Sequence, residues 1–280
     1  MSKVKIVTDS SAKFEPGVAE ALGVEIISLS IMVDDVIYKD SAIDGAEYMK
    51  MMAAASALPK TSQPPIGEFV EVYDRLGADG SEIISLHLTG LLSGTVEAAR
   101  QASQISKSKV TVIDSHFTDQ SLAFLVEDAA QLANDGADAE TILAAIEKGQ
   151  KNSLLYIGVA NLNNLVKGGR ISRATGVLSN VFNIRVVMQL LDTGLETMSK
   201  GRGNKAFNRW FDDLKKEKLN KLSSVKKIGI SHAAGLETAL KFKEELQEMF
   251  PNVHIPVLDT SPIVATHTGE GAFAIMLYLE

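Results

Sequence analysis

The chain alternates short apolar runs with amphipathic stretches, and this rhythm predicts most of its elements. Short runs rich in apolar residues are typical of buried strands, whereas apolar positions at helical spacing are typical of helices. In the first half we predict strands at 4–7, 25–32, 83–88 and 110–115, and helices at 46–57, 67–76, 93–103, 119–134 and 137–149. Such alternation is typical of a parallel sheet with helices on both faces. Residues 1–150 are therefore predicted to form an N-terminal α/β domain.

The rhythm changes after about residue 150. We predict strands at 153–158, 186–191, 195–198, 227–231, 254–258 and 271–279, long helices at 206–219 and 236–249, and a short helix at 161–166. Asp192-Thr193-Gly194 has the composition of a hairpin turn, which predicts an antiparallel pair on either side of it. Residues 151–280 are therefore predicted to form a C-terminal α+β domain with a mixed or antiparallel sheet, and the fold class is α/β.

Composition excludes several kinds of function. The 280 residues include 28 Lys and Arg against 35 Asp and Glu, a net charge of −7 that argues against general nucleic-acid or anionic-membrane binding. The absence of cysteine excludes disulfides, thiolate metal sites and cysteine nucleophiles. The histidines show no metal-ligand spacing, so we expect no metal site. The first residues lack a signal-peptide apolar region and no run is long enough to span a bilayer, so we expect a cytoplasmic protein.

Ser93 stands where a predicted strand gives way to a predicted helix. A helix start offers unpaired N–H groups and the positive end of a dipole, which together with a hydroxyl can hold a carboxylate or phosphate. The alternative is an ordinary Ser cap of that helix. Thr61-Ser62-Gln63-Pro64-Pro65 also places hydroxyls beside permissive backbone.

Three other segments have both a structural and a functional interpretation. Lys167-Gly168-Gly169-Arg170 is either a helix C-terminus or a phosphate contact, although no phosphate-binding loop motif occurs in the chain. His267 follows a predicted strand end at Ile263 and Val264, and is either a loop histidine bonded to backbone or a ligand contact. The basic segment 200–205 is either a solvated turn or a docking patch for an acidic partner.

Serine chemistry gives an alternative function. Asp114-Ser115-His116 contains the residue types of a hydrolase triad, but neighbouring side chains on a strand point to opposite sides. A serine hydrolase that uses Ser93 or Ser115 with His267 is a second hypothesis, although the chain lacks a G-x-S-x-G elbow at Ser93. A DNA-binding regulator, suggested only by segment 200–205, is a third.

An ordered set of motifs resembles one family. The motifs are Val7-Thr8-Asp9-Ser10, Thr61-Ser62-Gln63-Pro64, Leu92-Ser93-Gly94-Thr95, Asp114-Ser115, Asn161-Leu162 through Lys167-Gly168-Gly169-Arg170-Ile171, and Thr266-His267 followed by glycines. Together they resemble the DegV family of bacterial fatty-acid-binding proteins, which includes the substrate-binding subunit of a fatty acid kinase. The chain departs from the family at Glu270, where the His-x-Gly-Pro-Gly motif has proline.

The resemblance implies two domains with one long-chain fatty acid, such as palmitate or oleate, held between them. It implies that the carboxyl group meets Thr61 and Ser93 with His267 nearby, and Ser62 and Gly94 are further candidate contacts. It also implies that Arg170 and Arg202 face a partner kinase, which would phosphorylate the acid. We therefore expect a lipid carrier without catalytic residues, cofactor or nucleic-acid partner, and a transient membrane contact during lipid exchange is compatible with that role.

Overall fold

The computed structural model describes residues 4–176, 184–203, 205–222 and 224–280. The N-terminal strands and helices are β1 (Val4–Asp9), α1 (Val18–Ala21), β2 (Glu25–Ile27), β3 (Ser30–Val33), β4 (Val36–Lys39), α2 (Gly45–Ala54), β5 (Lys60–Ser62), α3 (Ile66–Gly77), β6 (Glu82–His87), α4 (Thr95–Ile105), β7 (Val110–Asp114), α5 (Asp119–Asn134) and α6 (Ala139–Lys151). The later ones are β8 (Ser153–Val159), α7 (Asn163–Lys167), β9 (Ala174–Thr175), β10 (Arg185–Leu191), β11 (Gly194–Gly201), α8 (Lys205–Glu217), β12 (Val225–Ala233), α9 (Leu236–Met249), β13 (Val257–Asp259), α10 (Pro262–Thr268) and β14 (Ala272–Leu279). No helix among these described residues is both long and apolar enough to cross a bilayer.

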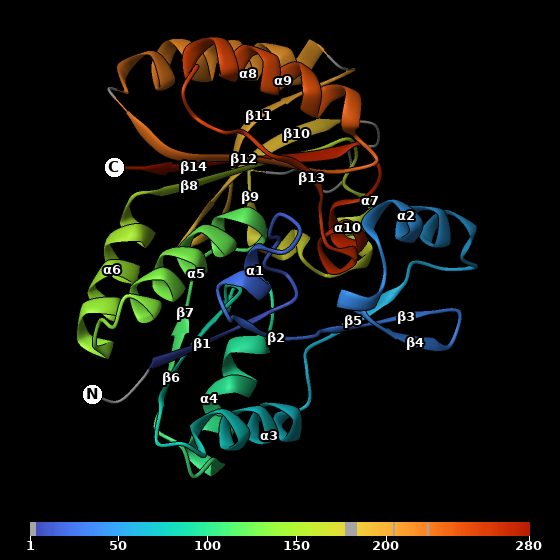
Figure 1. Cartoon of the computed structure of the whole chain (residues 1–280). Coiled ribbons are helices and arrows are strands. Elements are labelled where there is room, and N and C mark those ends of the chain that lie inside the picture. The colour runs from blue at the N-terminus through green and yellow to red at the C-terminus, as the bar shows by residue number, and fades with distance from the viewer. Residues whose placement is uncertain (1–3, 177–183, 204, 223) are drawn as a thin grey trace.

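The strands form three sheets; the two larger ones stack with helices in layers, and the three-stranded sheet lies to one side of them (Figure 1). A four-stranded parallel sheet has the order β2-β1-β6-β7, and a mixed seven-stranded sheet has the order β13-β12-β14-β8-β10-β11-β9. Helix α5 packs between these two sheets, α3 and α4 cover the outer face of the first, and α8 and α9 cover the outer face of the second. The predicted α/β fold, with a parallel N-terminal sheet and a mixed C-terminal sheet, is confirmed.

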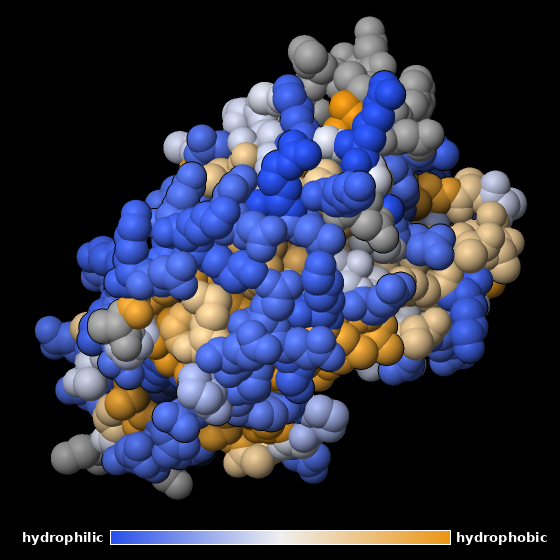
Figure 2. Space-filling view, turned by 90° about the horizontal axis from the view of Figure 1, so that it is seen from above, coloured by the Kyte–Doolittle hydropathy of each residue, from blue (hydrophilic) through white to orange (hydrophobic). Residues whose placement is uncertain are grey.

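The outer helices follow the amphipathic rule. Phe207, Trp210, Phe211 and Leu214 recur at helical spacing on α8, and all four are buried against the seven-stranded sheet. Figure 2 looks down on this side of the molecule, where the surface is mainly hydrophilic. The apolar stripe therefore holds the helix on the sheet while its polar face meets solvent.

A small antiparallel sheet, β4-β3-β5, was not predicted. Residues 25–32 were expected to be one strand, and this is wrong: β2 pairs with β1, whereas β3 turns away to pair with β4 and β5. The break lies at Leu29, whose N–H bonds to the Ser10 hydroxyl instead of to a strand. Asp34 and Asp35 then form a tight hairpin turn with positive φ angles of 46° and 66°.

The predicted domain boundary near residue 150 stays a prediction. The strands before that point belong to the four-stranded and three-stranded sheets, and β8 onward forms the seven-stranded sheet. Helix α10 crosses this division, because it packs against α2, β3 and β5 as well as α7 and β12.

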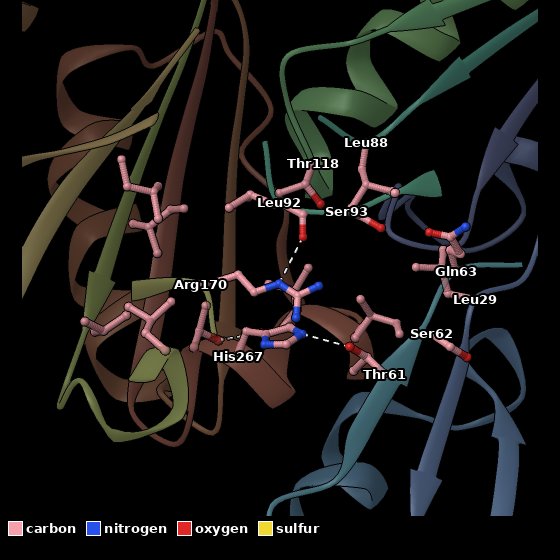
Figure 3. A pocket seen from close by; sticks show the side chains of 18 of the residues that line it. Leu29, Thr61, Ser62, Gln63, Leu88, Leu92, Ser93, Thr118, Arg170 and His267 are labelled. Carbon is pink, nitrogen blue, oxygen red and sulfur yellow. Dashed lines mark hydrogen bonds between the residues drawn. The ribbon is translucent and has the colours of Figure 1, made fainter. Parts of the chain in front are cut away.

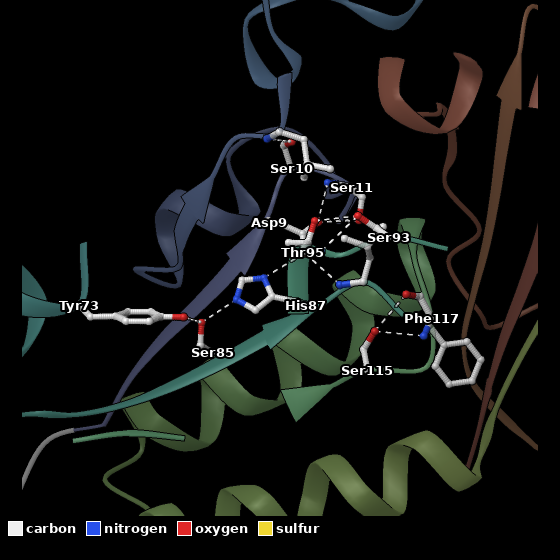
Figure 4. Close-up of polar contacts among 12 residues, drawn as sticks. Asp9, Ser10, Ser11, Tyr73, Ser85, His87, Ser93, Thr95, Ser115 and Phe117 are labelled. Carbon is white, nitrogen blue, oxygen red and sulfur yellow. Dashed lines mark hydrogen bonds and ion pairs between the residues drawn. The ribbon is translucent and has the colours of Figure 1, made fainter. Parts of the chain in front are cut away.

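A buried polar chain fixes the carboxyl ends of β1 and β6 (Figure 4). His87 Nδ1 lies 3.0 Å from Oδ2 of Asp9, and its Nε2 lies 2.6 Å from the Ser85 hydroxyl, which is 2.7 Å from that of Tyr73. All four side chains are fully buried. Oδ2 of Asp9 also accepts from the N–H of Leu88, so the carboxylate holds the start of the loop that carries Ser93.

We predict that Asp9→Ala destabilises the fold by about 3 kcal/mol, because it leaves buried donors on Ser11, His87 and Leu88 without an acceptor. Urea unfolding at pH 7 measures the change. Asp79→Ala is the matched control, since that carboxylate is exposed at the surface. Equal effects of the two substitutions would contradict the assigned importance of the buried carboxylate.

Candidate functional site

A cavity of about 280 Å³ lies where the three sheets meet helix α10, close to the lower end of the range for ligand pockets. Its apolar lining comes from Leu29, Leu88, Leu92, Ile157, Val159, Leu165, Met188, Leu195, Ile263 and Val264. Its polar lining comes from Thr61, Ser62, Gln63, Ser93, Thr118, Arg170, His267 and Thr268. Figure 3 shows Arg170, His267 and Thr61 next to one another, with Ser93 and Thr118 nearby and labelled leucines between the polar side chains.

Thr61 and His267 are directly bonded at the polar side of the cavity (Figure 3). Thr61 lies on β5, opposite Ile31 of β3, and its Oγ1 is 2.9 Å from Nε2 of His267. The two residues are 206 positions apart in the sequence. The structure therefore brings together two residues that the motif pattern singled out.

His267 lies on the last turn of α10, not after a strand. The expectation of a strand end at Ile263 and Val264 is wrong, because Ser261 and Pro262 start a helix there. The Ser261 hydroxyl accepts from the N–H of Val264, and proline at the first helical position is preset for helix.

The imidazole of His267 is neutral at pH 7. Burial first, and then the charge of Arg170, lowers its pKa to about 4. Its Nδ1 is buried and has no hydrogen-bond partner within the described chain. The ring packs on Gly168, where a Cβ would come within 2.3 Å of Nδ1, so the ring position requires glycine there.

Ser93 is close to the start of α4 but is not its cap residue. That position belongs to Gly94, and the Ser93 hydroxyl bonds to the hydroxyl of Thr95 at 2.9 Å and accepts weakly from its N–H at 3.3 Å. Ser62 and Gly94 also line the cavity, and their role as head-group contacts stays a prediction. A Cβ on Gly94 would lie 2.1 Å from Oε1 of Gln63, so the two hydroxyl segments approach closely at this glycine.

Arg170 lies in the cavity wall, which the sequence reasoning missed. Its Nε donates to the carbonyl of Leu92 at 3.0 Å and its Nη1 to that of Gly168 at 2.8 Å. Burial lowers the pKa of the guanidinium, but it stays charged. Neither hydroxyl motif contains a cation, so only the fold could place this charge beside Ser93 and His267.

Arg202 is not brought to the cavity. It is exposed at the turn between β11 and α8, and Asn204 of the same basic segment lies outside the described residues. The short helix predicted before Lys167 is present as α7, and Gly168 ends it. Gln63, Thr118 and Thr268 also line the cavity without having been assigned a role from the sequence. Thr118 gave no signal beyond its place before a predicted helix.

The described side chains do not form a hydrolase triad. The Ser115 hydroxyl is buried and bonded to the backbone of Phe117, and Ser115 does not line the cavity. The Ser93 hydroxyl is bonded to Thr95, while His267 Nε2 is bonded to Thr61. No carboxylate bonds to His267 Nδ1 in the described chain, so the relay that orients a catalytic histidine is missing.

We predict that the ligand-free protein loses stability through His267 as the pH falls from about 6.5 to about 4. An unfolded chain protonates its histidine near pH 6.5, whereas the folded chain resists protonation until about pH 4. Stability should therefore fall more steeply on acidification in the wild type than in His267→Gln. Chemical unfolding between pH 7 and 4.5 tests this, and parallel curves would contradict it. Asp40, whose pKa burial raises to about 6, contributes equally to both proteins.

Comparison with known proteins identifies the family of the chain. The sequence model of the DegV family, described as an uncharacterised protein family, matches residues 3–280. DegV domain-containing protein YejH of Lactococcus lactis is 49% identical over 277 residues, and a DegV domain-containing protein of Streptococcus pneumoniae is 48% identical over 280 residues; each match covers 99% of both chains.

Two solved structures share the fold over nearly the full length. DegV of Bacillus subtilis, described as a fatty acid binding protein, has a TM-score of 0.90 and 27% identity, with all of both chains covered. A DegV family protein of Thermus thermophilus, described by its fatty acid binding, has a TM-score of 0.88 and 27% identity, covering 99% of this chain and 100% of that one. The chain therefore belongs to the DegV family.

Proposed function

We propose that this protein binds a long-chain fatty acid, such as palmitate or oleate, with its tail in the apolar part of the cavity. The observation that carries the proposal is the bond between Thr61 and a neutral His267 at the polar side of a cavity walled by Leu, Ile, Val and Met. The fatty acid binding described for the relatives from Bacillus subtilis and Thermus thermophilus supports the same ligand class.

The apolar walls are suited to supply most of the affinity. Each buried methylene contributes about 0.8 kcal/mol, so a long tail gives on the order of 10 kcal/mol before the losses of association. The head-group site then has only to orient the carboxyl group and satisfy its oxygens.

Thr61 and Ser93 fit that task as hydroxyl donors, with Ser62 and Gly94 as further contacts. When the neutral imidazole of His267 carries its proton on Nε2, it donates to Thr61 Oγ1, and the Thr61 hydroxyl proton is then directed elsewhere. That proton can bond a carboxylate oxygen. Arg170 adds a positive charge beside the same space, which favours the ionised acid.

We further propose that the protein presents the carboxyl group to a fatty acid kinase and does not act on it itself. The absence of a phosphate-binding loop motif in the sequence and of a hydrolase triad in the described chain supports a carrier over an enzyme. Arg202 is exposed and suited to docking, and Arg170 reaches the head-group space from the cavity wall. Lipid exchange at a membrane surface is compatible with this role.

We predict that an organic extract of freshly purified protein contains about one long-chain fatty acid per chain, measured by mass spectrometry.

Thr61→Val combined with Ser93→Ala should weaken palmitate binding about 10- to 100-fold without altering the fold, because it removes two hydrogen bonds to the head group. Ser103→Ala, which removes a hydroxyl of α4 outside the cavity, is the control. The proposal fails if no acid is extracted and added palmitate is not taken up.

We predict that Arg202→Ala leaves palmitate binding unchanged but lowers acyl phosphate formation about three- to tenfold when a fatty acid kinase catalytic subunit and ATP are supplied, because a docking charge is lost. Arg100→Ala, at an exposed arginine of α4, should change neither quantity. Emptying of the lipid site by Arg202→Ala would refute the docking assignment. Acyl phosphate formed from ATP by the chain alone would refute the division of labour.

A further inference from the structure

Thr118 has a buried hydroxyl that no described residue satisfies. The residue is only 5% exposed, and its Oγ1 has no hydrogen-bond partner in the described chain. It occupies the position before α5, with φ −151° and ψ 179°, where a threonine hydroxyl ordinarily caps the helix. Here it makes no capping bond, and the N–H of Gln120 bonds instead to the Asp119 carboxylate. Native structures rarely leave a buried polar atom unpaired, so this hydroxyl is a candidate for binding a ligand.

The unpaired hydroxyl faces the fatty-acid cavity. Thr118 lines the cavity, and Figure 3 shows its oxygen directed into it, on the same side as Ser93. Backbone bonds link the two segments, because the N–H of Thr89 donates to the carbonyl of Phe117 and the N–H of Ser93 donates to that of Thr89. Both hydroxyls therefore come from adjoining connections at the carboxyl ends of β6 and β7.

A buried water molecule is a weaker candidate for the partner of Thr118. The residue also borders an adjoining void of about 20 Å³, which has room for about one water molecule. A water needs two or more polar partners. The nearby hydroxyls of Ser231 and Thr260 already donate to Asp119, and that of Ser231 also accepts from Gln120, so they offer a water only their remaining acceptor positions. Of the described residues that have a buried unpaired side-chain atom, two line the cavity, Thr118 and His267.

We propose that Thr118 is a further ligand-binding residue, whose hydroxyl bonds to an oxygen atom of the bound acid. The inference rests on the proposed function, since it concerns the same cavity and the same ligand class. The oxygen belongs either to the carboxyl group or to a hydroxyl substituent on the acyl chain. A plain methylene chain offers no partner, so Thr118 would also make the site sensitive to where the ligand carries its oxygens.

The test compares Thr118→Val with Thr118→Ser, using delipidated full-length protein and titrating palmitate and 3-hydroxypalmitate by calorimetry. Valine keeps the shape of threonine and removes the hydroxyl, so we expect binding to weaken about 5- to 20-fold, whereas serine should retain most of the affinity. The ligand-free Thr118→Val protein should melt no lower than the wild type, because the hydroxyl it loses is unpaired. Thr8→Val is the matched control, since it removes a buried unpaired hydroxyl away from the cavity.

Each outcome decides the proposal. Weaker binding of both acids assigns the bond to the carboxyl group, and weaker binding of 3-hydroxypalmitate alone assigns it to the chain hydroxyl. Unchanged affinities for both acids in Thr118→Val overturn the inference and leave the proposed function standing. An equal loss in Thr8→Val, or a lower melting temperature with no recovery in Thr118→Ser, shows a structural role and also overturns it. If the wild type binds neither acid, the proposed function is wrong, and the inference, which depends on it, is wrong as well.

Discussion

The position of the cavity depends on how helix α10 is held at its first turn. Oδ1 of Asp40 accepts the N–H of Ile263 at 2.8 Å, although burial raises the pKa of this carboxyl to about 6. The hydroxyl of Tyr48 bonds to Thr266, and Nδ2 of Asn164 donates to the carbonyl of the same residue. Side chains from N-terminal and C-terminal segments thus fix one short helix. These bonds act together with the packing of Ile263 and Ala265 in the core to hold His267 against β5.

The electrostatics of the cavity depend on the charged and polar side chains that line it around helix α10. Among the described residues that line the cavity, Arg170 is the one permanent cation, and none is a carboxylate. Two backbone carbonyls hold the guanidinium, and its charge helps to keep His267 neutral. A single positive charge with neutral hydroxyls around it complements a single carboxylate. A protonated imidazole would add a second charge in a desolvated space, which burial disfavours.

The hydrophobic pattern was sufficient to predict the layers of the fold, because strand and helix periods are local properties of the chain. The parallel N-terminal sheet and the amphipathic α8 and α9 follow from it, and the turn residues at Asp192–Gly194 add the hairpin. The hydrophobic pattern was not sufficient where a hydrogen bond between residues distant in sequence interrupts a segment that has the periodicity of one strand. Residues 25–32 read as one strand, but the Ser10 hydroxyl takes the N–H of Leu29 and the chain changes sheet there.

The same distinction applies to the site. Thr61, Ser93 and His267 were named through the family resemblance, and the fold brings all three to one cavity. Arg170 was expected on a docking face, and its place in the cavity wall depends on carbonyls at Leu92 and Gly168 that no motif specifies. Thr118 could not be distinguished from a helix cap, because the difference is a bond that is not made. Buried atoms left unpaired in the ligand-free protein, Thr118 Oγ1 and His267 Nδ1 among them, disfavour that state. A ligand that satisfied one of them would stabilise the fold beyond its contacts with the apolar walls, which couples occupancy to stability.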